Sequence, residues 1–310
     1  MSTSLPSSTL HPLFLGGPTA TGKSEIALAL AEKIGGEIIS VDSMQVYRGL
    51  DIGTAKPTAV EQKRVPFHLI DVVDLAESFD AAKFVVLAEK AVVDIQSRGR
   101  TPIFCGGTGL YFQAYLGGLG EAPAADPGLR TELEALPFET LLHELRERDP
   151  ETYEKIDKQN PRRVIRALEV IRLTGKKFSE QRAEWRPKVP DPTPKTIVCL
   201  TRGQDDLHGR INARVDEMFR RGLVEETREL LKHGLNQNKT AMQAIGYRQV
   251  VEHLRGEHDL AQTVALVKMR TRQFAKRQLT WFRRHGDCRF FTPAPGDVPE
   301  KIITEIISAR

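Results

Sequence analysis

The sequence lacks long apolar runs and paired cysteines. None of its 310 residues lies in a stretch approaching the ~20 consecutive apolar residues that a membrane-spanning helix needs. The first ten residues carry no Lys or Arg and no apolar segment, which argues against a secretory signal. Three distant cysteines without a CxxC pair or Cys/His cluster predict neither a zinc site nor a disulfide framework. These absences favour a globular protein of the reducing cytoplasm.

Neither sign of charge dominates, but cations are unevenly distributed. The chain has 45 Lys and Arg against 41 Asp and Glu, a net charge of +4. Residues 162–177 contain six cations and one acid, Glu169, whereas residues 268–284 contain seven cations and no acid. Such segments are usually solvated helix faces, yet two of them favour a polyanionic partner.

The first part of the chain alternates short apolar runs with amphipathic segments. Strands are predicted over 12–16, 37–41, 68–73, 101–105 and 196–201, and helices over 23–34 and 80–98. Strands separated by helices indicate an α/β fold with a parallel sheet flanked by helices.

The pattern changes between residues 121 and 195, where helices replace strands. Helices are predicted over 126–136, 138–148, 150–157 and 161–174, followed by a proline-rich linker over 187–194. The later chain predicts helices over 205–221, 223–233, 240–254, 259–285 and 297–308, with a strand over 288–291. We therefore expect a core over 1–120 and 196–310, interrupted by a helical insertion over 121–195.

The most informative motif is a complete phosphate-binding P-loop between the first strand and the first helix. It comprises Gly17, Pro18, Thr19, Ala20, Thr21, Gly22, Lys23 and Ser24. Glycines let backbone N–H groups surround a polyphosphate, while Lys23 supplies a charge and the Ser24 hydroxyl can bind Mg²⁺. The motif indicates phosphate or nucleotide binding, including ATP, but names no reaction.

Two further segments follow the ends of strands that neighbour the P-loop. Asp42 follows the second strand and either binds Mg²⁺ through water, accepts a proton, or merely caps a helix. Thr108 lies in the Gly-rich segment after the fourth strand, which is otherwise a tight turn. Asp71 is an alternative metal ligand of the kind found in NTPases. Carboxyl ends of parallel strands share one crevice, so these groups are expected there.

The chain resembles one known family through six blocks that occur in order. They are GPTATGKS (17–24), SVDSMQVYRGLDIGTAKP (40–57), CGGTGLYFQAYLGGL (105–119), NPRRVIRALEVIRLTGK (160–176), GYRQ (246–249) and TRQFAKRQLTWFRR (271–284). Together these blocks resemble the tRNA dimethylallyltransferases, also called isopentenyl-tRNA transferases, of the bacterial type.

The resemblance implies an enzyme that modifies tRNA by prenyl transfer. Such an enzyme moves a dimethylallyl group from dimethylallyl diphosphate to N6 of the adenine directly 3′ of the anticodon, in tRNAs that read codons beginning with U. It implies that the P-loop holds the departing diphosphate with Mg²⁺, that Asp42 takes the amine proton, and that Thr108 positions the reacting groups. We expect a monomer that binds no membrane.

The resemblance also implies which residues contact each substrate. Arg210 and Arg214, four apart on a helix, either join Lys23 and the P-loop at the diphosphate or form surface ion pairs. The residues implied to contact tRNA are Asp42, Ser43, Met44, Gln45, Thr108, Arg130, Arg162, Arg163, Val164, Ile165, Arg166, Ala244, Ile245, Gly246, Tyr247, Arg248 and Gln249.

Three other functions share some of these features. An ATP-dependent small-molecule kinase would use the same P-loop and catalytic Asp, but would not need two basic helices. An RNA-binding ATPase without transferase activity would need an NTPase aspartate and a sensor residue or arginine finger. A non-enzymatic RNA-binding module would leave Asp42 and Thr108 without a role.

Overall fold

The structure, a computed structural model, describes residues 11–118, 123–182, 196–285, 287–293 and 299–308. The expected proline-rich linker and the N-terminal segment lie outside these residues. The chain forms two units, one of Met1–Phe112 with Thr193–Arg310 and one of Gln113–Pro192. The smaller unit occupies nearly the range expected for the insertion, 121–195.

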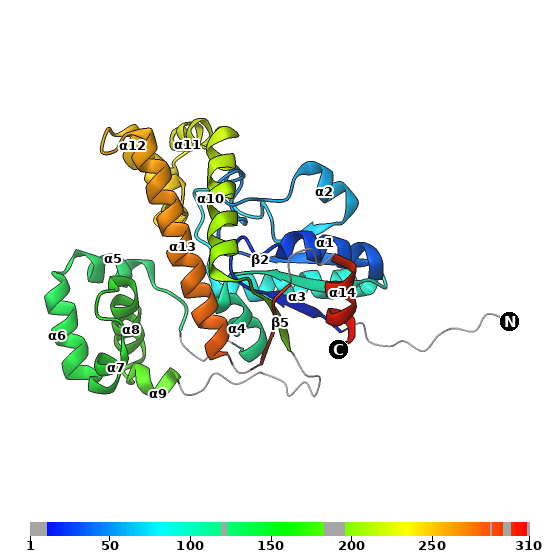
Figure 1. Cartoon of the computed structure of the whole chain (residues 1–310). Coiled ribbons are helices and arrows are strands. Elements are labelled where there is room, and N and C mark those ends of the chain that lie inside the picture. The colour runs from blue at the N-terminus through cyan, green and yellow to red at the C-terminus, as the bar shows by residue number, and fades with distance from the viewer. Residues whose placement is uncertain (1–10, 119–122, 183–195, 286, 294–298, 309–310) are drawn as a thin grey trace. The chain divides into compact units, whose positions relative to one another are not determined.

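A six-stranded parallel sheet forms the centre of the larger unit, with strand order β3–β2–β4–β1–β5–β6 (Figure 1). The strands are β1 (Leu13–Gly16), β2 (Gly36–Val41), β3 (Phe67–His68), β4 (Thr101–Gly106), β5 (Ile197–Leu200) and β6 (Cys288–Phe291). The predicted fold class, a helix-flanked parallel sheet carrying a P-loop, is confirmed.

Helices connect these strands and cover the sheet. In the larger unit they are α1 (Lys23–Ile34), α2 (Ala59–Arg64), α3 (Ala81–Ser97), α10 (Gln204–Arg220), α11 (Leu223–Lys232), α12 (Tyr247–Leu254), α13 (Leu260–Arg284) and α14 (Pro299–Ser308). Two short 3₁₀ helices, η1 (Leu235–Gln237) and η2 (Ala241–Gln243), precede α12, and α4 (Gly109–Gly117) follows β4.

Two predicted elements are wrong, and backbone geometry explains both. The strand expected over 68–73 ends at His68, because Leu69 and Asp71 adopt left-handed φ angles of 61° and 54° that break an extended chain. The helix expected over 240–254 is split into η2 and α12, because Gly246 has a φ of 100°.

The core of the larger unit lies on both faces of the sheet. Alternate strand residues point to opposite faces, so Leu15 and Ile103 join Leu30 of α1 and Ile303 of α14 in one cluster. Phe14 and Phe104 alternate with these residues and pack together on the other face, with their rings tilted by 30° and the ring centroids 5.0 Å apart. This packing fixes the strand ends from which the loops of the site extend.

Only helices occur in the described part of the smaller unit. They are α5 (Pro127–Ala135), α6 (Phe138–Arg148), α7 (Pro150–Lys155), α8 (Pro161–Thr174) and α9 (Phe178–Arg182). Asn160 caps α8 as predicted, since its side chain accepts a hydrogen bond from the Arg163 N–H group. The apolar face of α8 packs with Leu133 of α5 and Leu141 of α6.

Asp149 ties three segments of the smaller unit together. Its buried carboxylate accepts hydrogen bonds from the N–H and hydroxyl groups of Thr152 (3.0 and 2.6 Å) and of Ser179 (2.8 and 3.0 Å). Burial raises the pKa of this carboxyl, but the four donors outweigh burial and hold the pKa below its ordinary 3.8.

Replacing Asp149 should therefore destabilise the smaller unit. Asp149→Ala leaves buried donors without an acceptor and should lower the free energy of unfolding of this unit by about 3 kcal/mol. The stabilisation should be complete above pH 3.8 and be lost as pH falls through the lower folded pKa. Hydrogen exchange over residues 150–182 measures it, with the exposed Asp157→Asn as control; unchanged exchange in Asp149→Ala would contradict this role.

Candidate active site at the carboxyl ends of the strands

The P-loop between β1 and α1 adopts the backbone that an anion-binding turn requires. Gly17, Ala20 and Gly22 have φ angles of 136°, 65° and 96°. A Cβ atom at Gly17 would collide with the Leu200 carbonyl oxygen, so glycine is required there. The loop leads directly into the N-terminus of α1, whose peptide dipoles attract negative charge.

Two cations reach the loop from different elements. The Lys23 ammonium donates a hydrogen bond to the Pro18 carbonyl oxygen at 2.5 Å. The Arg214 guanidinium of α10 donates to the Thr19 hydroxyl at 3.3 Å. Both acceptors are neutral, so neither cation is compensated by these contacts and both can attract an anion. Burial, the largest cause, lowers the pKa of Lys23 to about 8.

Asp42 begins the turn after β2 and faces the same region. Its Oδ1 atom accepts hydrogen bonds from the N–H groups of Met44 (2.8 Å) and Gln45 (3.2 Å). Burial raises the pKa of Asp42 above its ordinary 3.8, and the two N–H donors and Lys23 only partly offset this effect. A half-buried carboxylate with a raised pKa is better suited to accept a proton than an exposed one.

Thr108 joins the turn after β4 to the turn that carries Asp42. Its hydroxyl oxygen accepts a hydrogen bond from the Ser43 N–H group at 3.2 Å. The N–H groups of Gly107 and Thr108 both donate to the Val41 carbonyl oxygen. The hydroxyl proton of Thr108 is therefore directed away from Ser43 and can serve a ligand.

These residues line two adjoining cavities. The smaller, of about 90 Å³, is lined by Lys23, Ser24, Asp42, Arg214 and Gln278 among others. The larger, of about 380 Å³, is lined by the polar residues Asp42 and Thr108 and by apolar side chains. The larger apolar residues among its lining are Met44, Val215, Met218, Ile245, Val267 and Phe274. Because both cavities share Thr19, Asp42 and Arg214, they form one recess with an anion-binding end and a more apolar end.

The two arginines proposed for the diphosphate differ in position. Arg214 lines both cavities. Arg210 lies outside the residues that line them, and its guanidinium pairs with Asp206 at 3.0 Å on the exposed face of α10. Arg210 therefore fits the interpretation as a surface ion pair, whereas Arg214 fits the interpretation as a residue of the anion-binding site.

The predicted RNA-contacting residues near α12 fall into two groups. Ala244 and Ile245 line the larger cavity, and Arg248 is exposed and pairs with Glu252. The Tyr247 side chain is fully buried and donates to Glu226 (2.6 Å), whereas Gln249 is buried and accepts a hydrogen bond from the Gly246 N–H group. The Tyr247 side chain is enclosed and cannot meet RNA directly, whereas Gln249 also lines a surface pocket beside Arg248, so RNA contact at Gln249 stays a prediction.

A similar division holds in the smaller unit. Arg162 and Arg163 are exposed at the start of α8. The side chains of Val164 and Ile165 are buried in the hydrophobic cluster, so in the predicted run 162–166 the side chains that are accessible to RNA are the arginines. Arg130 and Arg166 both pair with the buried Glu169, at 2.6 and 2.7 Å. The conspicuous acid in the basic segment 162–177 thus orients two of the predicted arginines.

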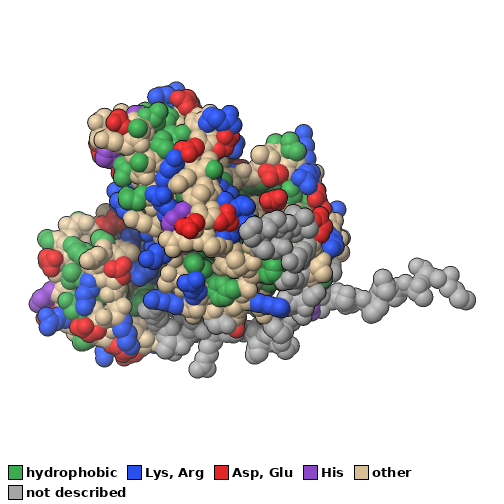
Figure 2. Space-filling model, viewed as in Figure 1, with side chains coloured by type: hydrophobic (Ala, Val, Ile, Leu, Met, Phe, Trp, Pro, Cys, Tyr) green, Lys and Arg blue, Asp and Glu red, His purple; other side chains and the backbone are tan. Residues whose placement is uncertain are grey.

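Helix α13 carries the second basic segment. Lys276, Arg277, Arg283 and Arg284 are exposed, and Figure 2 shows Lys and Arg side chains along the course of this helix. Arg277 also lines the larger cavity. The basic face of α13 therefore extends to the recess itself.

Sequence reasoning missed Gln278 and Arg202. Gln278 of α13 hydrogen-bonds both the P-loop and Gly107, and Arg202 donates to the Thr21 carbonyl oxygen at 3.0 Å. One signal for Gln278 is present: it shares a helix face with the buried Ala275 and Phe282, where a polar residue needs a specific partner. Arg202 offers no comparable pattern.

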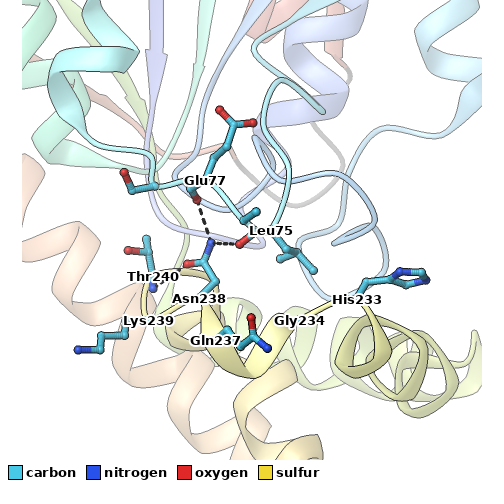
Figure 3. A pocket seen from close by; sticks show the side chains of 10 residues that line it. Leu75, Glu77, His233, Gly234, Gln237, Asn238, Lys239 and Thr240 are labelled. Atoms are coloured by element: carbon cyan, nitrogen blue, oxygen red, sulfur yellow. Dashed lines mark hydrogen bonds between the residues drawn. The ribbon is translucent and has the colours of Figure 1, made fainter. Parts of the chain in front are cut away.

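A separate surface pocket lies at residues 75–78 and 233–240 (Figure 3). The Asn238 amide holds its two sides together by donating to the carbonyl oxygens of Leu75 (2.7 Å) and Glu77 (3.0 Å). None of its lining residues lines the recess. We assign it a structural role.

The described residues contain no group of three or more His, Cys, Asp or Glu side chains that could hold a metal by themselves. Ser24, the predicted Mg²⁺ ligand, lines the anion-binding end together with Asp42. One hydroxyl and one carboxylate suit Mg²⁺ only when phosphate oxygens and water complete its shell. Among the described helices, none has both the length and the apolar character needed to cross a bilayer.

Comparison with known proteins identifies relatives of this chain. The family model described as IPP transferase matches residues 45–285. tRNA dimethylallyltransferase 1 of Trichlorobacter lovleyi is 48% identical over 275 residues, covering 87% of this chain and 90% of the relative. The tRNA dimethylallyltransferase of Thermotoga petrophila is 42% identical over 289 residues, covering 92% and 93%.

Solved structures give the same result for the fold. The full-length tRNA isopentenylpyrophosphate transferase of Bacillus halodurans is 40% identical, with a TM-score of 0.70 and coverage of 97% of this chain and 95% of the other. A eukaryotic dimethylallyltransferase acting on tRNA is 28% identical, with a TM-score of 0.76 and coverage of 97% and 80%.

The lowered pKa of Lys23 predicts a pH-dependent affinity for pyrophosphate. The free ammonium is charged below pH 8 and neutral above it, so affinity should fall as pH rises through about 8. Calorimetric titration with pyrophosphate between about pH 6.5 and 9.5 measures this dependence. Dividing the pyrophosphate affinity of the unaltered protein by that of Lys23→Met cancels the effect of the ionisation of pyrophosphate itself. If this ratio stayed constant over the pH range, the expectation would be contradicted.

Proposed function

Because this chain belongs to the IPP transferase family, we propose that it transfers a dimethylallyl group from dimethylallyl diphosphate to N6 of the adenine directly 3′ of the anticodon. The tRNAs are those that read codons beginning with U, and diphosphate is released. The observation that carries the proposal is the single recess in which the P-loop, Asp42 and Thr108 meet.

The anion-binding end of the recess suits the diphosphate of the donor. An allylic C–O bond breaks readily when charge on the departing oxygen is neutralised. Lys23, Arg214, and the N–H groups at the start of α1 supply positive charge there. Burial lowers the pKa of Arg214, yet an arginine stays charged at neutral pH. The site thus stabilises the leaving group.

Asp42 is placed to accept the proton of the attacking amine. An exocyclic adenine amine is a weak nucleophile because its lone pair is delocalised into the ring. As N6 forms its bond to the allylic carbon, the C–O bond breaks, the diphosphate keeps that electron pair, and one N6 proton passes to Asp42. The burial that raises the pKa of Asp42 favours this transfer. Thr108, held at Ser43, positions a reacting group with its free proton.

Magnesium fits this arrangement as a companion of the donor. Ser24 would hold it, with phosphate oxygens and water completing its shell. Bound there, it would neutralise charge on the diphosphate. We further propose a monomer in the cytoplasm, consistent with the free thiols of Cys105, Cys199 and Cys288.

Family membership argues against the kinase alternative, since the family model and the relatives are transferases that act on tRNA. Asp71, the alternative metal ligand, pairs with Lys56 and lies outside the residues that line the recess. A kinase would transfer the γ-phosphate of ATP, which is directly measurable.

The decisive assay uses unmodified tRNA and isotopically labelled dimethylallyl diphosphate. Digestion of the tRNA should release labelled N6-dimethylallyladenosine, and the label should disappear when the adenine 3′ of the anticodon is replaced. No label in tRNA, or transfer of the γ-phosphate in a parallel assay with labelled ATP, would contradict the proposal.

Removing the carboxylate of Asp42 should slow prenyl transfer strongly and leave tRNA binding nearly unchanged. Asp42→Asn retains an oxygen for the Met44 and Gln45 N–H groups but accepts no proton, so turnover should fall by roughly 10²–10⁴. Single-turnover kinetics and tRNA filter binding separate the two effects. Asp74→Asn, at an exposed carboxylate paired with Arg48, is the matched control; normal turnover of Asp42→Asn would exclude Asp42 as the base.

The two arginines of α10 provide a second matched pair. Arg214→Ala should raise KM for dimethylallyl diphosphate about 10-fold or more, because it removes a charge from the cavity wall. Arg210→Ala, which breaks a surface ion pair, should change KM less than about 3-fold. Steady-state kinetics at saturating tRNA test both, and equal effects would show that cavity position is irrelevant.

A further inference from the structure

Gln278 is a buried amide on a helix rich in cations. Its side chain is 7% exposed, and both ends of the amide are bonded. Oε1 accepts a hydrogen bond from the Thr19 N–H group at 2.9 Å, and Nε2 donates to the Gly107 carbonyl oxygen at 2.9 Å. If the amide were turned over, its NH₂ group would face the Thr19 N–H group and its oxygen would face the Gly107 carbonyl oxygen. Its partners therefore fix its orientation.

The bond to Thr19 removes an N–H group from the anion-binding loop. In P-loops, the lysine reaches the outer phosphates of the bound chain. Here the Lys23 ammonium contacts the Pro18 carbonyl oxygen, immediately before Thr19. Gln278 therefore occupies the loop at the end where a further phosphate would lie.

There is little space around this amide. A Cβ atom at Gly107 would collide with Nε2 of Gln278 and lie 3.2 Å from the Gly17 carbonyl oxygen. A Cβ atom at Gly17 would collide with the Leu200 carbonyl oxygen of β5. The loop is thus in close contact with β5 and with Gln278, and opening it at Thr19 would break the hydrogen bond to Gln278.

We infer that Gln278 is a specificity-determining residue that closes the outer end of the P-loop, so that the loop accepts a diphosphate and rejects a longer polyphosphate chain. The inference rests on the proposed function, since it explains how a loop that serves triphosphates in other proteins is restricted to a diphosphate donor. Charge alone predicts the opposite preference, because Lys23 and Arg214 attract the more negative anion more strongly.

Competition between two inorganic anions tests the inference. The inhibition constants of pyrophosphate and tripolyphosphate are measured against dimethylallyl diphosphate, with free magnesium held constant. The unaltered protein should bind tripolyphosphate about 10-fold more weakly than pyrophosphate, the size of one hydrogen bond to a charged group. Gln278→Ala, which frees both the space and the Thr19 N–H group, should shift this ratio about 10-fold toward tripolyphosphate.

Two further variants separate space from hydrogen bonding. Gln278→Met frees the Thr19 N–H group but keeps most of the volume, so its ratio should lie between those of the other two proteins. Gln273→Ala changes an exposed glutamine of the same helix and should keep the original ratio. Thermal melting by circular dichroism checks that each variant folds.

The outcomes distinguish this inference from the proposed function. Tighter or equal binding of tripolyphosphate by the unaltered protein would overturn the role of Gln278 without any variant, even if Gln278→Ala failed to fold. An unchanged ratio in folded Gln278→Ala would also overturn it. If the unaltered protein transferred no dimethylallyl group, the proposed function would fail, and calorimetry with the two anions would still test the selectivity.

Discussion

The Val41 carbonyl oxygen accepts hydrogen bonds from the N–H groups of Gly107 (3.2 Å) and Thr108 (3.1 Å), and the rest of the site depends on this junction. It joins the end of β2 to the end of β4, which are neighbouring parallel strands. A Cβ atom at Gly106 would collide with the same carbonyl oxygen, so only glycine permits this approach. The junction places Thr108 against Ser43 and therefore beside Asp42.

Whether a cation in this protein can attract a ligand depends on the partner that its side chain contacts. Lys23 and Arg214 contact a neutral carbonyl and a neutral hydroxyl oxygen, so their positive charge remains available to a ligand. Arg130 and Arg166 instead share the buried carboxylate of Glu169. That carboxylate is stabilised by the arginines and by the Asp126 N–H group, and it fixes the direction of both guanidinium groups. Net charge therefore says little about which arginines face an anion.

Helices α11 and α12 hold in place a loop that lines the recess. Glu226 accepts hydrogen bonds from the Tyr247 hydroxyl (2.6 Å) and the Ile52 N–H group (3.0 Å), and the Tyr247 oxygen accepts one from Gly53 (3.0 Å). These bonds hold the loop whose residues Thr54 and Ala55 line both cavities. The segment around Tyr247 thus acts on the site through the position of a loop.

The features that depend on residues close together in the chain could be predicted from the sequence alone. The P-loop, the strand–helix alternation, the Asn160 cap and the acid after β2 follow from local backbone preferences and from the period of apolar residues. Other features depend on how distant elements pack: Arg214 and not Arg210 lines the recess, Tyr247 and Val164 are buried, and Gln278 hydrogen-bonds the phosphate loop. Gln278 and Thr19 are 259 residues apart, and which residues meet across such a distance depends on how the elements pack.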